Sequence, residues 1–201
     1  MEKQIQSRKI EHSLTTHRHF ALHKPYGVIS QFTDNNNGKK KLLGDLYSFP
    51  EGTMAIGRLD EKSEGLLLLT TDGKTSMSIR SKAIEKEYYV QVDGNITADA
   101  INLLQKGVEI GIKGVNYKTL PCKVNILNPS PEFPERLRRI RDDRHGPTSW
   151  VSITITEGKY RQIRKMTAAV GFPTLRLIRV RIGEVRLNKL APGQVRIIDQ
   201  L

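Results

Sequence analysis

The run of four leucines from Leu66 to Leu69 constrains the fold of this chain more than any other feature. It lies in the segment GRLDEKSEGLLLLTTDG, residues 57–73. A continuous apolar run that ends at Asp72-Gly73 is typical of a strand buried on both faces. The triplet Arg58-Leu59-Asp60 precedes this run, so Asp60 is either half of a surface ion pair or a reactive carboxylate on a rigid support. The spacing alone favours the surface pair.

Asp60 has two acidic neighbours, Glu61 and Glu64, which raises the alternative of a two-carboxylate hydrolase site. Adjacent residues of an extended segment point apart, and Glu64 falls in an expected turn, so this alternative is disfavoured. A single carboxylate can still act as a covalent nucleophile if a nearby cation offsets its desolvation. The segment therefore predicts at most a one-carboxylate site.

Positive charge is the second informative feature. The 201 residues include 33 Lys and Arg against 21 Asp and Glu, a net charge of +12. Residues 136–186 hold 13 of the basic and four of the acidic residues. Clustered positive charge favours a nucleic-acid partner, because each neutralised phosphate releases counterions. Solubility needs a net charge of only roughly 2–8, and an acidic membrane surface is a less favoured partner.

Cysteine content and hydropathy limit the class of protein. The single Cys122 excludes an intrachain disulfide and a Cys-rich zinc site, as is usual in a reducing cytoplasm. No apolar run approaches the ~20 residues that cross a bilayer, and no charged-then-apolar leader opens the chain. We therefore expect a cytoplasmic protein that does not bind membranes.

The remaining chain predicts many strands with scattered helices. Strands are expected in segments 20–33 (two, around a Pro-Gly turn), 65–71, 86–94, 108–127, 149–158 and 174–187, and helices in segments 74–81, 97–107 (capped by Thr97) and 159–172. The Pro-rich, charged segment 128–147 is expected to be a long loop. Because strands and helices do not alternate strictly, the pattern favours an α+β fold with a mostly antiparallel mixed sheet flanked by helices.

Two basic segments are candidates for RNA contacts. The helix expected over 159–172 would have Lys159, Arg161, Arg164 and Lys165 in its first turns, where basic side chains and backbone N–H groups both favour phosphates. An ordinary solvated basic face is an equally good interpretation. The segment that follows is expected to form a strand or a pair of strands. It should bury Leu175, Leu177, Ile178 and Val180 and expose Arg176, Arg179 and Arg181, each in part.

Two tyrosines and four histidines complete the candidates. Tyr88 and Tyr89 point to opposite faces of a strand, so one could stand in a cleft as a platform for an unstacked base, although core packing is the better interpretation in isolation. The histidines at positions 12, 17, 19 and 23 match no metal-ligand spacing, so no metal site is expected.

Four segments occur together in the order, and with roughly the spacing, seen in one protein family. They are HKPYG (23–27), GRLDEKSEGLLLLTTDG (57–73), KEYYV (86–90) and EGKYRQIRKMTAAVGFPTLRLIRVRIG (157–183). With them, the chain resembles the bacterial ribosomal-RNA pseudouridine synthases of the RsuA-like family from about Phe20 to the C-terminus. The resemblance implies a catalytic domain over residues 19–201, with two subdomains around a central RNA-binding cleft, after a flexible basic tail over residues 1–18. Many relatives have an N-terminal S4-type RNA-binding domain, which we do not expect here.

The resemblance also implies roles for single residues. Asp60 matches the catalytic aspartate, Arg164 the basic residue that pairs with it, and Tyr88 the tyrosine that packs against the uracil. Ile163 matches an aliphatic residue on the other side of the base, and Arg58 the arginine that occupies the stack vacated by the target nucleotide.

Four further residues are expected at the RNA. Lys24 belongs to a Lys-Pro motif whose role in the family is mainly structural, and Arg161, Gln162 and Lys165 belong to the basic helix.

The implied function is isomerisation of a specific uridine of large-subunit (23S) ribosomal RNA to pseudouridine by a monomer. This reaction breaks a carbon–nitrogen bond, turns the uracil and rejoins it through carbon without redox change, so no cofactor is expected. A non-catalytic ribosome assembly factor with the same fold is the alternative. A DNA-binding regulator is disfavoured, because the basic helix lacks a preceding helix-turn partner.

Overall fold

The computed structural model describes residues 17–33, 38, 40–81, 83–136, 138, 140 and 143–201. The expected tail falls outside this range except for His17 and Arg18, which are in neither helix nor strand. In chain order the elements are β1 (His19–Lys24), β2 (Met54–Ile56), β3 (Glu64–Thr70), α1 (Gly73–Ser81), β4 (Lys86–Asp93), α2 (Ala98–Lys106), β5 (Glu109–Ile112), β6 (Val115–Lys118), β7 (Lys123–Ile126), a 3₁₀ turn (Asp143–His145), β8 (Thr148–Ile155), α3 (Gln162–Ala169), β9 (Thr174–Ile182), β10 (Val185–Arg186) and β11 (Val195–Ile198).

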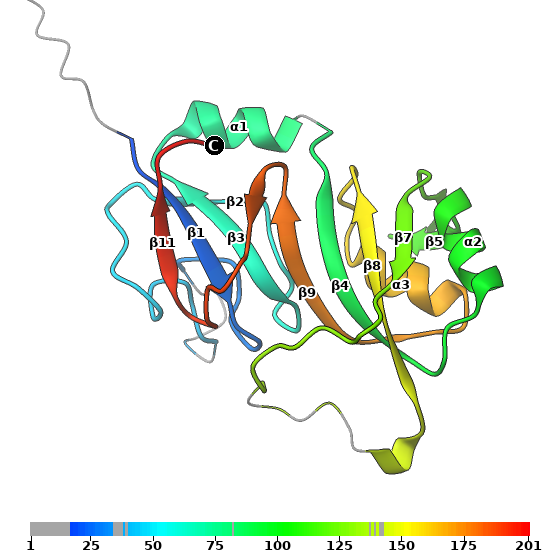
Figure 1. Cartoon of the computed structure of the whole chain (residues 1–201). Helices are drawn as coiled ribbons and strands as arrows, with labels where there is room; N and C mark the ends of the chain where they lie inside the picture. The colour runs from blue at the N-terminus through cyan, green and yellow to red at the C-terminus, as the bar shows by residue number, and fades with distance from the viewer. Residues whose placement is uncertain are drawn as a thin grey trace, which may run out of the picture.

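A mixed sheet of nine strands organises the described part of the chain (Figure 1). Its order is β11-β1-β3-β9-β4-β8-β7, with β2 beside β3 and β10 beside β9, while β5 and β6 form a separate hairpin. The ladders between these strands are antiparallel except the one between β3 and β9. The predicted α+β class with a mostly antiparallel mixed sheet is therefore confirmed. No helix among the described residues is long and apolar enough to cross a membrane.

The leucine run forms β3, and all seven residues of this strand are buried. Leu66 and Leu68 pack into one hydrophobic cluster, and Leu67 and Leu69 pack into another on the opposite face. The alternation follows from the two-residue period of a strand. The predicted burial on both faces is confirmed.

The sheet has two halves that meet where β3 runs parallel to β9. This ladder pairs only Glu64 with Ile178 and Gly65 with Arg179. Gly65 has φ +101°, and a Cβ atom there would lie 2.3 Å from the carbonyl oxygen of Arg179. Only glycine permits so close an approach of the two backbones.

A buried ion pair joins the two halves. Arg176 Nε and Nη2 lie 3.0 and 2.8 Å from the two carboxylate oxygens of Glu64, and Nη2 also donates to the carbonyl of Pro134 at 2.9 Å. Arg176 and Arg179 are both buried, which corrects the expectation that they are partly exposed. Both guanidinium groups are bound by residues of β3, which is distant in sequence: Glu64 pairs with Arg176, and the Leu66 carbonyl accepts from Arg179. These contacts allow the two arginines to be buried.

Most predicted elements are present, with two differences. The segment 20–33 contains a single strand, and its expected second strand is replaced by an isolated bridge between Val28 and Lys41. The third helix begins at Gln162, so Lys159 and Arg161 precede it. The predicted Thr97 cap of α2 is confirmed, since its side chain accepts a hydrogen bond from the Ala100 N–H.

Candidate active site

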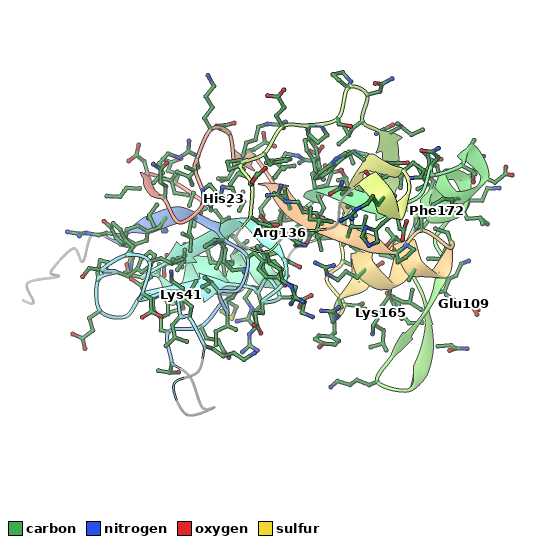
Figure 2. The ribbon with its side chains drawn as sticks, turned by 90° about the horizontal axis from the view of Figure 1, so that it is seen from below. His23, Lys41, Glu109, Arg136, Lys165 and Phe172 are labelled. Atoms are coloured by element: carbon green, nitrogen blue, oxygen red, sulfur yellow. The ribbon has the colours of Figure 1, made fainter. Side chains whose placement is uncertain are left out.

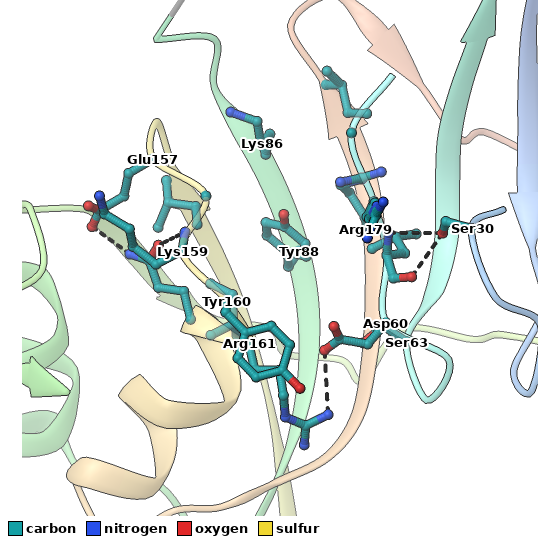
Figure 3. Close-up of a pocket in the computed structure, with 18 of the residues that line it drawn as sticks. Ser30, Asp60, Ser63, Lys86, Tyr88, Glu157, Lys159, Tyr160, Arg161 and Arg179 are labelled. Atoms are coloured by element: carbon teal, nitrogen blue, oxygen red, sulfur yellow. Dashed lines mark hydrogen bonds and ion pairs between the residues drawn. The ribbon is translucent and has the colours of Figure 1, made fainter. Parts of the chain in front are cut away.

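A pocket of about 750 Å³ lies between the two halves of the sheet (Figure 3). One wall is the loop between β2 and β3, residues 57–63, together with residues 29–31. The opposite wall comes from β4, β9 and the turn that precedes α3. The pocket therefore brings together segments that are far apart in the sequence.

The loop that contains Asp60 is held by hydrogen bonds on both sides of that residue. The Ser30 hydroxyl donates to the Leu59 carbonyl at 2.8 Å and accepts from the Leu59 N–H at 3.0 Å. The Ser63 N–H donates to the Asp60 carbonyl, and the Gly27 N–H donates to the Glu61 carbonyl. Asp60 is thus fixed at the pocket although it belongs to a loop.

Arg161 is the ion-pair partner of Asp60. Its Nη1 lies 3.5 Å from Asp60 Oδ2, and the two side chains are 36% and 27% exposed. Arg161 immediately precedes α3 and has a left-handed backbone with φ 51°. The expected pairing of Asp60 with Arg164 is not the one in the structure, because this turn directs the earlier arginine to the carboxylate.

Arg164 instead holds the backbone of the Asp60 loop. Its Nη2 donates to the Lys62 carbonyl at 2.7 Å and lies 3.5 Å from Ser63 Oγ, and its Nη1 lies 3.4 Å from the Thr174 carbonyl. Burial, and then the charge of Arg161, lower the pKa of Arg164. Arg164 therefore links α3 and β9 to the loop and positions Asp60 indirectly.

Three buried side chains give the pocket an apolar wall. Tyr88 on β4, Ile163 on α3 and Leu177 on β9 line it and belong to one hydrophobic cluster. Tyr89 points to the other face and packs against the Phe133 ring with centroids 6.1 Å apart. The choice of Tyr88 over Tyr89 as the residue in the cleft agrees with this geometry.

Two exposed side chains also line the pocket. Arg58 is exposed, as expected for a residue that meets RNA. Tyr160 is 68% exposed, and Lys165 Nζ lies 5.4 Å from the centroid of its ring. Figure 3 shows Tyr160 and Arg161 on the side of the pocket that faces Asp60.

The other expected RNA contacts differ in position. Lys24 is completely buried and donates to the carbonyls of Pro25 and Val28 at 2.9 and 2.7 Å, so its place among the RNA-contacting residues is corrected to a structural one. Gln162 lines the pocket but is buried, and its amide binds Glu157 and the Lys159 N–H. Lys165 lies outside the pocket lining and donates to the Gly111 carbonyl at 2.6 Å.

The lining residues that sequence reasoning did not identify as candidates include Ser30, Lys86, Leu177 and Arg179. Lys86 Nζ donates to the carbonyls of Ile84 and Thr156, and burial, then the charge of Arg179, lower its pKa. The Lys-x-Tyr spacing on β4 offered a signal for Lys86, since residues two apart on a strand share a face. No sequence pattern pointed to Ser30, Leu177 or Arg179, because only the tertiary fold brings them to the pocket.

The described residues do not indicate a metal site. Among the residues with described positions, no three His, Cys, Asp or Glu side chains gather in an arrangement that could hold an ion. The Nδ1 atoms of His19 and His23 are engaged instead with Thr70 Oγ1 and the Leu190 carbonyl.

Comparison with known proteins decides the family. Residues 18–169 match the model of the family described as RNA pseudouridylate synthase. The chain belongs to this family. Membership confirms the resemblance drawn from the sequence and makes the protein an isomerase that acts on RNA.

Several relatives that are more than 40% identical to this chain are named synthase E. From the segments PTSW and FPTLRLIR, the sequence predicts a resemblance to the large-subunit enzyme called synthase E. The "Ribosomal large subunit pseudouridine synthase E" of Xanthomonas axonopodis pv. citri is 44% identical over 85% of this chain and 88% of that protein. The protein of the same name from Xanthomonas campestris pv. campestris is 41% identical over 89% and 94%. A solved structure described as a pseudouridylate synthase superposes with a TM-score of 0.71 at 29% identity, covering 90% of this chain and 70% of that one.

Proposed function

We propose that this protein converts a specific uridine of large-subunit ribosomal RNA to pseudouridine, with Asp60 as the catalytic carboxylate. The observation that carries the assignment is the Asp60–Arg161 pair at the edge of a nucleotide-sized pocket in a member of the synthase family. The large subunit is inferred from the names of the relatives.

The geometry suits chemistry by one carboxylate. Asp60 is partly exposed to the pocket, and the guanidinium of Arg161 lies 3.5 Å from its carboxylate. A preorganised charge of this kind needs no rearrangement when the glycosidic bond breaks. Asp60 can add to the base or the sugar, or remove a sugar proton, from the same position.

The pocket suits a uracil that has left its helix. Extruding a base takes a few kcal/mol, which stacking and apolar contacts in the pocket must offset. Tyr88 offers a ring, and Ile163 and Leu177 offer aliphatic surface. Arg58, exposed at the same site, is placed to enter the gap that the nucleotide leaves.

Basic side chains near the pocket suit the surrounding RNA. Arg136 stacks on the Tyr26 ring at 4.6 Å, and its positive charge is among the causes that lower the pKa of Arg164. Figure 2 shows Lys41, Arg136 and Lys165 spread across the side of the molecule seen from below. Such cations bind RNA through phosphates and shape rather than through sequence.

We also propose that the protein is a cytoplasmic monomer. Its single catalytic domain would have a cleft between two subdomains. Ribosomal RNA as substrate supports the location. The division of the sheet into two halves with the pocket between them supports the domain description.

Purified protein should be incubated separately with transcripts of large-subunit and small-subunit ribosomal RNA, and pseudouridines then mapped in both. We expect one uridine, or very few, to be modified in the large-subunit transcript and none in the other. Modification confined to small-subunit RNA would refute the substrate assignment. Absence of pseudouridine in both transcripts and in assembling particles would refute the function.

A further inference from the structure

Three arginines of β9 differ in how their charges are compensated. Arg176 is paired with Glu64, and Arg181 is paired with Glu85 and Glu87. Arg179 forms no ion pair with any residue whose position the structure describes. Only its Nε has a hydrogen-bond partner in that set, the Leu66 carbonyl at 2.7 Å, and its Nη2 is buried without one.

Arg179 lines the pocket next to Tyr88. The two residues are cross-strand partners in the β4–β9 ladder, so their side chains leave the sheet on the same face. A register shift between Glu87 and Tyr88 produces this pairing, as β-bulges do where a side chain must be redirected. The Nε hydrogen bond to the Leu66 carbonyl on β3 anchors the guanidinium at the pocket, where Figure 3 labels Arg179 and Tyr88.

An uncompensated cation that is only 4% exposed destabilises a fold unless something else binds it. Buried donors without a partner are rare in native proteins, and each needs an explanation. A ligand that enters the pocket and accepts a hydrogen bond would supply the missing partner. The position is deep, among Leu177 and Ile182, whereas a hydrated phosphate would remain at the rim with Arg58 and Arg161.

We propose that Arg179 holds the flipped uracil by donating a hydrogen bond from its guanidinium to a carbonyl oxygen of the base. This inference rests on the proposed function and adds a base-positioning residue to it. The uracil is the part of the nucleotide that would lie against Tyr88, and its carbonyl groups are its strongest acceptors.

The geometry of the reaction supports a fixed donor. Isomerisation breaks the bond from C1′ to N1, forms the bond from C1′ to C5, removes the proton from C5 and leaves N1 protonated. The base turns by half a revolution about its N3–C6 axis, which exchanges the two carbonyl groups. Arg179 therefore meets one carbonyl before the turn and the other after it, and the same hydrogen bond serves substrate and product.

The test uses synthetic RNA around the mapped uridine, with uridine, 2-thiouridine or 4-thiouridine at the reacting position. Sulfur is a poor acceptor, so at least one thio-substitution should slow single turnover by the wild-type protein about tenfold, which corresponds to one charged hydrogen bond. The variant Arg179→Lys should react more slowly with uridine and lose most of this thio effect. Arg181→Lys is the matched control, since Arg181 is paired with two glutamates and lies outside the pocket lining.

The outcomes separate this inference from the function. If the wild-type protein modifies the uridine RNA but both thio RNAs react within about twofold of it, the inference is refuted without any variant. The inference is also refuted if folded Arg179→Lys retains the full thio effect. If no pseudouridine forms in the unmodified RNA, the proposed function itself fails, and this inference fails with it.

Discussion

Arg161 Nη1 lies 3.5 Å from Asp60 Oδ2, while Arg164, one turn further along α3, binds the backbone of the loop that contains Asp60. The two arginines therefore act on the same carboxylate in different ways. Arg161 forms an ion pair with the carboxylate, and Arg164 fixes the position of the loop that contains it. The first two predictions separate these roles.

Replacing Arg161 by Gln should lower the single-turnover rate by about 100-fold, because Asp60 loses its preorganised cation. The affinity for RNA should fall much less. Rates and binding constants should be measured on the same RNA at the same salt concentration, with exposed Arg186→Gln as the charge-matched control. Equal losses in rate and affinity would identify Arg161 as a phosphate contact.

Replacing Arg164 by Ala should lower both the free energy of unfolding, by about 1–3 kcal/mol, and the reaction rate. The cause is the loss of the hydrogen bonds to Lys62 and Thr174, which leaves the Asp60 loop free to shift. Urea unfolding and single-turnover kinetics measure the two effects. A variant with wild-type stability and impaired activity alone would contradict a positioning role.

Breaking the Glu64–Arg176 pair should destabilise the fold by about 3–5 kcal/mol, because one buried charge is left without its partner. Glu64→Gln and Arg176→Met can be compared with the double variant by urea unfolding. The double variant should be more stable than the sum of the single effects implies. Additive losses would show that the pair does not join the halves of the sheet.

Stability should depend on pH through Lys24. Burial is the main cause that lowers its pKa from 10.5 to about 7, and nearby Glu64 opposes the shift. Below this pKa the lysine is charged in both the folded and unfolded protein. Between about 7 and 10.5 only the unfolded state binds the proton, so the contribution of Lys24 to stability rises with pH.

The wild-type protein and Lys24→Met should therefore be unfolded in urea at pH 6.5 and pH 9, taken as roughly the two sides of that pKa. The difference in unfolding free energy should shift in favour of the wild type at the higher pH. The hydrogen bonds to Pro25 and Val28 persist with a neutral amine, which still has two N–H groups. A difference that does not change with pH would contradict the lowered pKa.

Local patterns were sufficient to predict much of the fold. The leucine run predicted β3, and the Thr97 cap with its apolar spacing predicted α2. Asp60, Tyr88 and Ile163 were identified through motif resemblance, and the structure brings all three to one pocket.

Relationships between distant residues were not predictable in the same way. The parallel contact between Gly65 and Arg179 joins positions more than a hundred residues apart, and periodicity carries no information on it. The pairing of Asp60 with Arg161 depends on a left-handed residue just before a helix, which a smooth helical pattern hides. The buried arginines of β9 resembled exposed ones because the residues that bind them lie on another strand.

The most direct measurement compares Asp60→Asn with the wild-type protein in single-turnover conversion of the mapped uridine. The matched control is Glu109→Gln, which removes an exposed carboxylate on β5, outside the pocket lining. We predict no pseudouridine above background with folded Asp60→Asn and a wild-type rate with Glu109→Gln. Conversion by folded Asp60→Asn at the wild-type rate would contradict the catalytic role of Asp60.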